Sequence, residues 1–332
     1  MRDVAALVGV SKQTVSAVIN DKPGITEETR ARVLAAIERL RYRPDHTARS
    51  LRSGKTGTLA LFVSDVSNSV LGRMASAAEN YAHSVNYNLI LYNTHDDAER
   101  EMAYVNTVAH RSVDGVLFVA ATEPHRGHEI LEAVGIPSVT VDRVPEGYDG
   151  ASIALDNLKA GRLAAEHLLE LGHTRLVHLA GPFGLRLARE RQRGFVEALQ
   201  RADRRAEVDV EAAAGWGCQP GYEAMQRLLK RCPRLTALFA ATDHSAIGAM
   251  HAIREAGLRI PGDVSVIGLD NIEMAAFVDP PLTTIRQFLP QMATLGVQML
   301  IDILDGKGLS QQHVVIEPTL VVRQSTAPPD RA

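Results

Sequence analysis

The sequence predicts a small all-α domain at the N-terminus, followed by an α/β body made of two doubly wound parallel-sheet lobes. The first 44 residues show apolar side chains at helical spacing and no strand-like run. From residue 58 onward, short apolar runs alternate with amphipathic helices, a pattern typical of parallel sheets with helices on both faces. The chain of 332 residues is long enough for two or three domains, and its 45% apolar residues can supply their cores.

The first twenty residues, MRDVAALVGVSKQTVSAVIN, have the pattern of two short helices joined by a tight turn. Gly9 lies where the end of the first helix needs a positive φ, and the Ser11 hydroxyl can cap the second helix. This is the pattern of a helix-turn-helix, whose second helix lies in the DNA major groove. An ordinary amphipathic helical hairpin would show the same pattern. The polar side chains expected to face outward from the second helix are Lys12, Gln13, Thr14 and Ser16.

A third helix should complete this domain. Thr26 can cap it, and acidic residues follow in its first turn, where they favour the helix dipole. Pro44 ends the domain, and a short helix capped by Asp45 and then a linker are expected over 45–57. The apolar side chains expected to close the three-helix core are Val33, Leu34, Ile37 and Leu40.

The distribution of charge supports binding to nucleic acid at one end of the chain. Residues 1–55 hold eleven Lys and Arg against six Asp and Glu, a net charge of +5, which leaves −8 for the rest of a chain whose total is −3. A run of charge is usually a solvated face. Here it coincides with the helix-turn-helix pattern, so phosphate attraction is concentrated on that domain.

The α/β body contains seven apolar runs, which fit two doubly wound lobes better than one. A helix at 288–305 should return the chain to the first lobe, and a final strand near 314–323 should return it to the second. The runs with strand character are 58–63, 88–92, 115–120, 137–141, 175–181, 236–241 and 263–269. The helices expected between most of them span 69–85, 98–110, 158–171, 187–201, 221–230 and 244–256.

Composition and motifs exclude several classes of protein. No apolar run reaches the length of a membrane span, and nothing at the N-terminus has the pattern of a signal peptide, so a soluble, cytoplasmic chain is expected. Cys218 and Cys232 have neither metal-ligand nor redox-motif spacing.

Enzyme motifs are also missing. The sequence has no G-x-S-x-G elbow and no dinucleotide-binding G-x-G-x-x-G after a strand. The GKT string near residue 55 lacks the earlier glycine of a phosphate loop, because Arg49 stands there. His125, His128 and Glu129 have loosely metal-like spacing, but on an expected loop we interpret them as a chance cluster. No catalytic residue, metal or cofactor is therefore predicted.

Several strings, in this order and spacing, resemble the LacI/GalR family of bacterial transcription regulators, and the resemblance covers essentially the whole chain. It implies a ligand-responsive, sequence-specific DNA-binding protein, a repressor of carbohydrate-uptake or catabolic genes, which acts as a homodimer on a pseudo-palindromic operator. The strings are DVA (3–5), GVS (9–11), TVS (14–16), Asn20, Tyr42, Pro44, ARSL (48–51), DVSN (65–68), VDR (141–143), LGHTRLVHLAGP (171–182), GLD (268–270) and PPLTTIRQ (280–287).

The resemblance assigns DNA contacts to the recognition helix and to the short helix after it. Lys12 and Gln13 would read bases, since Gln pairs with adenine and Lys with guanine acceptors. Ala17 stands where the family usually has arginine, so no operator sequence can be transferred. Ala48 and Leu51 belong to a helix that would enter the minor groove, with Leu51 as a wedge between bases. The residues expected to position the phosphate backbone are Ser11, Thr14, Ser16 and Asn20.

The body of this family resembles periplasmic sugar-binding proteins, which hold a ligand between two hinged lobes. Carboxylates and arginines supply the acceptors and donors that sugar hydroxyls need, and a tryptophan ring offers an apolar face. Val70 and Leu71 stand where aromatic residues are common in the family. A sugar, a sugar phosphate and a sugar acid remain open, with a purine as the next candidate. The effector-binding residues implied are Asp142, Arg143, Arg191, Trp216, Thr242, Asp270 and Gln287.

The expected organisation is a DNA-binding headpiece at 1–44 and a hinge helix with its linker at 45–57. The first lobe takes 58–156 and about 288–316, and the second takes 157–287 and about 317–327. The family pattern has a threonine cap before its first helix, so the true start is expected upstream of Met1. The alternative reading is a cytoplasmic sugar- or purine-binding protein whose headpiece does not bind DNA specifically.

Overall fold

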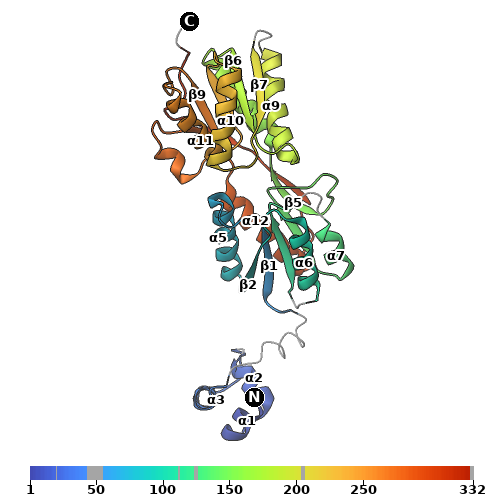
Figure 1. Cartoon of the computed structure of the whole chain (residues 1–332). Coiled ribbons are helices and arrows are strands. Elements are labelled where there is room, and N and C mark those ends of the chain that lie inside the picture. The colour runs from blue at the N-terminus through green and yellow to red at the C-terminus, as the bar shows by residue number, and fades with distance from the viewer. Residues whose placement is uncertain (20, 43–54, 111–112, 123–125, 203–205, 330–332) are drawn as a thin grey trace. The chain divides into compact units, whose positions relative to one another are not determined.

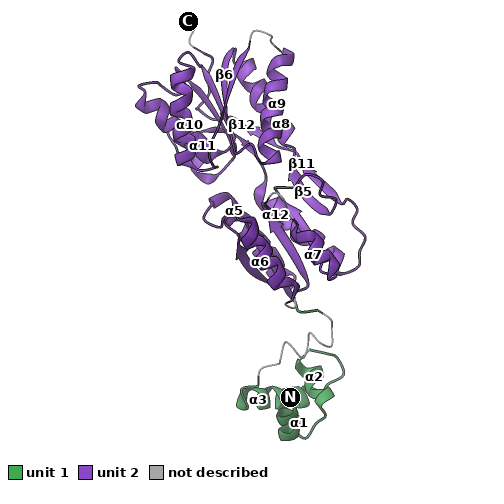
Figure 2. Ribbon diagram, turned by 45° about the vertical axis from the view of Figure 1, so that its right-hand side comes forward, with its two compact units in different colours: residues 1–56 green, residues 57–332 purple. Residues whose placement is uncertain are grey.

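The computed structural model of the chain describes residues 1–19, 21–42, 55–110, 113–122, 126–202 and 206–329 (Figure 1). It divides into two compact units, residues 1–56 and 57–332, which Figure 2 colours green and purple. The two units are the headpiece and the body. The predicted residues Asn20, Ala48, Leu51 and His125, and the expected hinge helix, lie outside the described residues.

The described residues of the headpiece form three helices, as predicted. Gly9 ends the first helix with φ 74°, and Ser11 Oγ accepts a hydrogen bond from Thr14 N at 3.1 Å. Thr26 caps the third helix by accepting from Thr29 N at 3.4 Å. The helices are α1 (Arg2–Val8), α2 (Lys12–Ile19) and α3 (Glu27–Arg39), and the buried side chains between them are Val4, Ala5, Val8, Val15, Val18, Val33 and Ala36.

Two residues expected in this core are not in it. Leu34 is 51% exposed and Leu40 is 42% exposed. Val33, Ala36 and Ile37 follow the i, i+3, i+4 spacing of one helix face, and Leu34 lies about 100° around the helix from Val33. Leu40 is the residue at which the helix ends, so its side chain no longer follows that face.

The first lobe of the body is a parallel sheet with a pair of helices on each face. Helices α5 (Ser69–Ser84) and α12 (Leu289–Leu304) pack on one face, and α6 (Ala98–Ala109) and α7 (Gly127–Ala133) cover the other. Among the described residues the strands are, in spatial order, β11 (His313–Ile316), β5 (Ala151–Leu155), β4 (Ser138–Val141), β3 (Gly115–Val119), β1 (Thr58–Val63) and β2 (Asn88–Asn93).

The second lobe repeats this plan. Helices α8 (Asn157–Glu170) and α9 (Arg186–Ala202) cover one face of its sheet, and α10 (Cys218–Arg231) and α11 (Asp243–Glu255) cover the other. A short 3-10 helix, η1 (Glu273–Ala276), follows the strand β9. The described strands are, in spatial order, β12 (Thr319–Val321), β10 (Thr283–Arg286), β9 (Ser265–Asp270), β8 (Ala237–Ala240), β6 (Arg175–Ala180) and β7 (Glu207–Ala212), with β12 antiparallel to β10.

The body differs from the sequence-based expectation at five elements. Strands β5, β7 and β10 were not predicted, because none of them shows a strong apolar run. Helix α7 replaces an expected loop, so His128 and Glu129 lie on a helix. The single final strand is two strands, β11 in the first sheet and β12 in the second, because Glu317–Pro318 separates them where the chain passes between the lobes.

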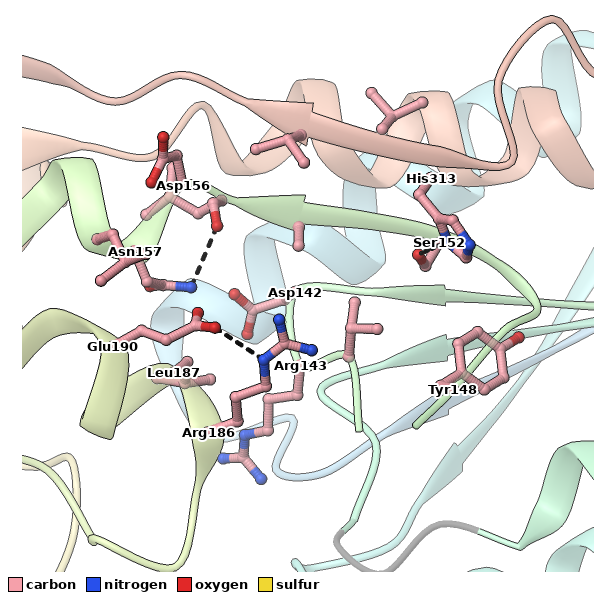
Figure 3. Close-up of a pocket in the computed structure, with 16 residues that line it drawn as sticks. Asp142, Arg143, Tyr148, Ser152, Asp156, Asn157, Arg186, Leu187, Glu190 and His313 are labelled. Atoms are coloured by element: carbon pink, nitrogen blue, oxygen red, sulfur yellow. Dashed lines mark hydrogen bonds and ion pairs between the residues drawn. The ribbon is translucent and has the colours of Figure 1, made fainter. Parts of the chain in front are cut away.

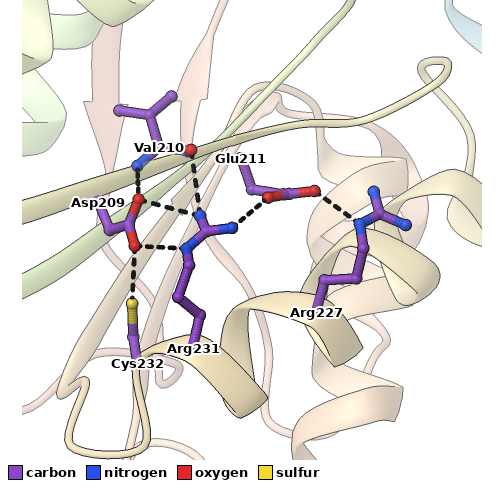
Figure 4. Close-up of polar contacts among 6 residues, drawn as sticks. All are labelled: Asp209, Val210, Glu211, Arg227, Arg231 and Cys232. Carbon is purple, nitrogen blue, oxygen red and sulfur yellow. Dashed lines mark hydrogen bonds and ion pairs between the residues drawn. The ribbon is translucent and has the colours of Figure 1, made fainter.

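Strand β7 is held by charged groups on the face of the sheet that α10 covers (Figure 4). Arg231 of α10 donates to both carboxylate oxygens of Asp209, at 2.7 and 2.9 Å, and to Glu211 at 2.8 Å. The hydrogen bonds from Arg231 lower the pKa of Asp209 to about 2. Cys232 Sγ donates to the same carboxylate at 3.0 Å. The acidic residues of β7 interrupt its apolar pattern, so the strand was not recognised in the sequence. In the structure, the same residues anchor β7 to α10.

Two further features are absent from the described part of the chain. None of its helices is long and apolar enough to cross a membrane. No group of three or more His, Cys, Asp or Glu side chains is placed there to hold a metal ion.

Candidate functional site

A cavity lies between the two lobes of the body, at the carboxyl ends of their strands. Asp142 follows β4, Asp270 ends β9, and Thr242 follows β8 by two residues. Ligands of open α/β sheets bind at these ends of the strands. The lining includes all seven residues expected to bind the effector, which are Asp142, Arg143, Arg191, Trp216, Thr242, Asp270 and Gln287.

Arg191 is positioned by the close crossing of α8 and α9. A Cβ on Gly161 would lie within 3.0 Å of the Arg191 carbonyl oxygen, and one on Gly194 within 3.0 Å of the Leu158 carbonyl oxygen. The buried Arg191 side chain donates from Nε to Asn157 Oδ1 and from Nη1 to the Ala241 carbonyl, both at 2.8 Å. These bonds hold its guanidinium at the cavity wall.

Arg143 is held from the first lobe. It is 6% exposed and pairs with Asp96 at 2.5 Å. Asp96 follows β2, and both His95 and Asp96 have positive φ, of 57° and 56°. Such backbone conformations are uncommon outside glycine, and they turn this loop toward the end of β4. The charge of Arg143 is thus paired within the protein.

Trp216 reaches the cavity because Gly181 makes room for it. A Cβ on Gly181, the residue after β6, would lie within 3.0 Å of three atoms of the indole ring. The Arg191 guanidinium carbon lies 5.7 Å from the ring centroid, within the range of a cation–π contact. Thr242 Oγ1 donates to the Trp216 carbonyl at 2.9 Å and accepts from Ser245 N at 3.0 Å. Thr242 therefore caps α11 and fixes the Trp216 loop, in addition to lining the cavity.

The two carboxylates of the site are in unusual environments. Asp142 and Asp270 have positive φ, of 75° and 129°, which is costly for non-glycine residues and concentrates at functional sites. Burial raises the pKa of Asp142, against the effect of Arg191 and Arg143. Burial also raises the pKa of Asp270 well above its usual range, and the nearby Asp243 carboxylate adds to this rise.

The side chain of Gln287 has one polar atom at the cavity that makes no hydrogen bond to the described residues. Its side chain is 3% exposed and donates from Nε2 to Asp270 Oδ1. Its Oε1 is buried without a hydrogen-bond partner among the described residues. An unpaired buried acceptor is costly, so it needs an explanation. A ligand hydroxyl that donates to this atom would supply one.

The cavity is small, at about 40 Å³. That volume holds only a few water molecules. A sugar-sized ligand therefore requires the lobes or the lining side chains to move apart. Ser69 Oγ and His244 Nε2, which come from different lobes and lie 3.3 Å apart, form one contact that such an opening would break.

Several residues of the site were not predicted. His244 and Leu187 line the cavity, and Asn68 lies beside Val70 and Leu71 on the first-lobe side. Asn68 is within the DVSN string and caps α5 by accepting from Val70 N at 3.0 Å, so the string was the available signal. Asn157 and Asp96, which hold the two arginines, carry no comparable local signal.

The headpiece presents the predicted DNA-reading residues on α2. Ser11, Lys12 and Gln13 are exposed, whereas Thr14 and Ser16 are half-buried. Ser11 Oγ and Thr14 Oγ1 lie 2.9 Å apart, so these hydroxyls act together at the start of the helix. Val15 and Val18 are buried in the core of the headpiece, whereas Lys12 and Gln13 are exposed.

Comparisons with known proteins match both parts of the chain. Residues 1–45 match the family model described as bacterial regulatory proteins, lacI family, and residues 165–326 match that of a periplasmic binding protein-like domain. The ribose operon repressor of Escherichia coli (strain K12) is 35% identical over 327 residues, which are 98% of this chain and 99% of that protein. The HTH-type transcriptional repressor PurR of Edwardsiella ictaluri (strain 93-146) is 35% identical over 329 residues, 98% of this chain and 96% of that protein.

Solved structures show the same similarity. A lac repressor dimer bound to operator and the anti-inducer ONPF has a TM-score of 0.87 and 27% identity, and the match covers 98% of both chains. A complex of the transcriptional regulator CelR with cellobiose has a TM-score of 0.75 and 30% identity, covering 97% of this chain and 98% of that one.

Proposed function

Because the chain belongs to the lacI family of bacterial regulatory proteins, and is therefore a ligand-responsive DNA-binding repressor, we propose that its effector is a neutral sugar bound between the lobes of the body. It acts in the cytoplasm on genes for sugar uptake or catabolism, and no catalytic role is proposed. The observation that carries the effector proposal is the buried Gln287 Oε1, which lacks a partner among the described residues at a cavity of paired charges.

The pairing of charges favours a neutral ligand over an anionic one. Arg143 already pairs with Asp96, and Arg191 donates to Asn157 and to a backbone carbonyl. A phosphate or carboxylate group would have to compete with Asp142 and Asp270 for the charge of Arg191, because both of these residues already interact with it electrostatically. Sugar hydroxyls can instead donate to the carboxylates and to Gln287 Oε1, and can accept from the guanidinium groups.

The apolar part of the cavity also favours a sugar over a purine. A flat purine is held best between stacking surfaces. Trp216 supplies one ring, but the first-lobe side carries the aliphatic side chains of Val70 and Leu71. One aromatic face opposite aliphatic groups suits a sugar ring, whose C–H face is apolar and whose edge carries hydroxyls.

Trp216 fluorescence tests the effector class, since it is the single tryptophan of the chain. The full chain is titrated with D-ribose, D-glucose, D-galactose and cellobiose, then with ribose 5-phosphate, gluconate and hypoxanthine. We expect an emission change with a neutral sugar alone. Asp270→Ala should abolish this change and leave the operator affinity of the ligand-free protein unaltered. A response confined to the phosphate, the acid or the purine would overturn the proposal.

On DNA, Lys12 and Gln13 are proposed to read base edges in each half of a pseudo-palindromic operator. Selection of bound sequences from random DNA would identify that operator. Gln13→Ala should then cost about 1–3 kcal/mol at one base position of each half-site and relax specificity there. Gln200→Ala, an exposed α9 position in the body, is the matched control. An equal loss on all sequences would assign Gln13 to the phosphate backbone instead.

We propose that the chain is a homodimer, and that β2 and η1 take part in its interface. Ile90 and Leu91 on the edge strand β2 are each 41% exposed. Met274 and Phe277, in and just after η1, are 56% and 76% exposed. Exposed large apolar side chains in groups mark interaction sites, and the lac repressor to which the chain is similar is a dimer on its operator. The hinge contacts of Ala48 and Leu51 remain predictions outside the described residues.

A further inference from the structure

A second cavity, of about 370 Å³, adjoins the interlobe cavity of about 40 Å³ (Figure 3). It lies between β5, β11 and the first turns of α9, and we call it the edge cavity. Asp142, Arg143 and Leu187 line both spaces. We propose that the edge cavity binds a second sugar ring, so that the effector is a neutral disaccharide and not a free monosaccharide. This inference rests on the neutral-sugar effector proposed above and names its class more closely.

The floor of the edge cavity is one face of two paired strands. Ser152 on β5 pairs with His313 on β11, and Ala154 pairs with Val315. Because side chains alternate along a strand, these four residues share a face. Val314 and Ile316 pack against the hydrophobic core from the opposite face. Val315 is 60% exposed, so the floor continues to the protein surface and a ligand can reach it from solvent.

The walls provide groups that suit the hydroxyls of a sugar. Asp156 and Asn157 come from the start of α8, and Glu190 and Leu187 come from α9. Figure 3 shows Asp142 and Arg143 between these α9 residues and the strands. Aliphatic side chains of the floor alternate with polar ones, which matches a ring that has an apolar face and a polar edge.

The charges of the edge cavity exclude an anionic occupant. Arg186 pairs with Glu190 at 2.7 Å, and Arg143 pairs with Asp96. The carboxylate of Asp156 accepts from Lys159 N at 2.8 Å and adds a further negative charge. Both arginines of the lining therefore have acidic partners. A phosphate or carboxylate group would have to displace one of these partners to form an ion pair.

The two cavities are also linked by a hydrogen bond. Asn157 lines the edge cavity, and its Oδ1 accepts from Arg191, which lines the interlobe cavity, at 2.8 Å. A ring that touches Asn157 would thus act on the group that orients Arg191. A ligand that spans both spaces contacts the two lobes at more points than one confined to 40 Å³.

Isothermal titration of the full chain with matched sugars tests the proposal. The pairs are D-glucose with maltose and cellobiose, and D-galactose with lactose and melibiose; D-ribose is added as a further monosaccharide. We expect at least one disaccharide to bind about tenfold tighter than its monosaccharide. Ala154→Phe, which fills the edge cavity from its floor, should remove this gain and leave the monosaccharide Kd unchanged.

Two further variants keep the result interpretable. Val315→Trp fills the same cavity from an exposed position, where folding is less at risk, and should act as Ala154→Phe does. Lys230→Phe on the exposed face of α10 is the control and should retain the gain. Monosaccharide binding as tight as that of every disaccharide, or a gain that survives both filling variants, would overturn the edge-cavity proposal alone. If none of the sugars binds, the neutral-sugar effector itself fails, and this inference fails with it.

Discussion

Gly181 shows how one residue without a side chain controls a binding surface. It follows β6 and lies against the flat face of the Trp216 indole, where a Cβ would approach three ring atoms within 3.0 Å. The indole ring can occupy this place because Gly181 has no side chain. The LGHTRLVHLAGP string identified this residue only as part of a resemblance, and the contact itself gives it a physical role.

We predict that Gly181→Ala displaces the Trp216 ring. The tryptophan emission should shift, and affinity for the neutral sugar should fall by about tenfold, because a misplaced ring loses its packing against the ligand. Gly184→Ala is the control, since a Cβ there has no heavy atom within 4 Å. Steady-state fluorescence and titration calorimetry measure both effects. An unchanged spectrum and Kd would show that the indole does not contact the ligand.

His178 is a buried residue whose charge bears on stability. It lies in β6 with its ring against those of Phe195 and Phe239, and its Nδ1 forms a hydrogen bond with the Phe239 carbonyl at 2.9 Å. Burial lowers the pKa of His178 to about 4, from 6.5. In the unfolded chain His178 is therefore protonated below about pH 6.5, whereas in the folded protein it stays neutral down to about pH 4. This residue must destabilise the fold as the pH falls through that window.

Urea unfolding at pH 7 and pH 4.5 measures this effect. From the two pKa values, His178 should remove about 2–3 kcal/mol of stability between them. Over the same pH interval, the free energy of unfolding of His178→Phe should fall by about 2–3 kcal/mol less than that of the unaltered protein. Equal losses in the two proteins would mean that His178 titrates normally in the folded state.

At the scale of elements, the crossing of α8 and α9 decides where the site places its arginine. Gly161 and Gly194 let the two backbones touch, and Arg191 lies one turn before Gly194 on α9. Glycine in a helix interior costs about 1 kcal/mol relative to alanine. Here that cost is offset by the close packing of the two helices and by the hydrogen bond from Arg191 to Asn157 at the start of α8.

We predict that Gly194→Ala destabilises the body despite its better helix propensity. The added methyl would lie within 3.0 Å of the Leu158 carbonyl oxygen, and overpacking of this kind costs about 1–3 kcal/mol. The sugar should also bind more weakly, because the helix that carries Arg191 is pushed outward. Arg193→Ala, at the neighbouring exposed position, should change stability by no more than about 0.5 kcal/mol. Thermal unfolding would refute the prediction by showing Gly194→Ala to be the more stable protein.

At the scale of the whole molecule, the proposed function depends on two copies of the chain. A two-fold dimer reads two half-sites of one operator, so operator affinity and dimerisation are linked. In the proposed dimer, effector binding is expected to change operator affinity, and typical couplings of about 1–3 kcal/mol correspond to about a 5- to 150-fold change.

The exposed side chain of Phe277 offers a test of the dimer. Phe277→Asp should convert the protein to a monomer in light scattering at micromolar concentration, because a charge would be buried in the interface without a partner. Operator affinity should fall with it. Val134→Asp replaces another exposed apolar residue, 52% exposed at the end of α7, and should leave the dimer intact. A dimeric Phe277→Asp protein would place the interface elsewhere.

Local sequence patterns were enough to predict the helices of the headpiece and most of the helices and strands of the body. Gly9, Ser11 and Thr26 act on the backbone within a few residues of themselves, so their roles could be read before any tertiary contact was known. The carboxylates at strand ends were likewise predictable, because the end of an apolar run is visible in the sequence. Leu34 and Leu40 show the limit of this, since apolar spacing alone does not say which face of a helix is buried or where the helix ends.

Tertiary structure alone decided the contacts between residues far apart in the chain. Asp96 pairs with Arg143, which is 47 residues away in the sequence, and Asn157 accepts a hydrogen bond from Arg191, which is 34 residues away. The floor of the edge cavity joins Ser152 to His313, 161 residues apart. None of these pairs has a local pattern, because each depends on which strands become neighbours in a sheet and which helices cross. The family, most of the elements and the candidate residues of the effector site were predictable from local patterns in the sequence. The folded chain decided which charges are already paired, which acceptor is left over and how much space lies beside it.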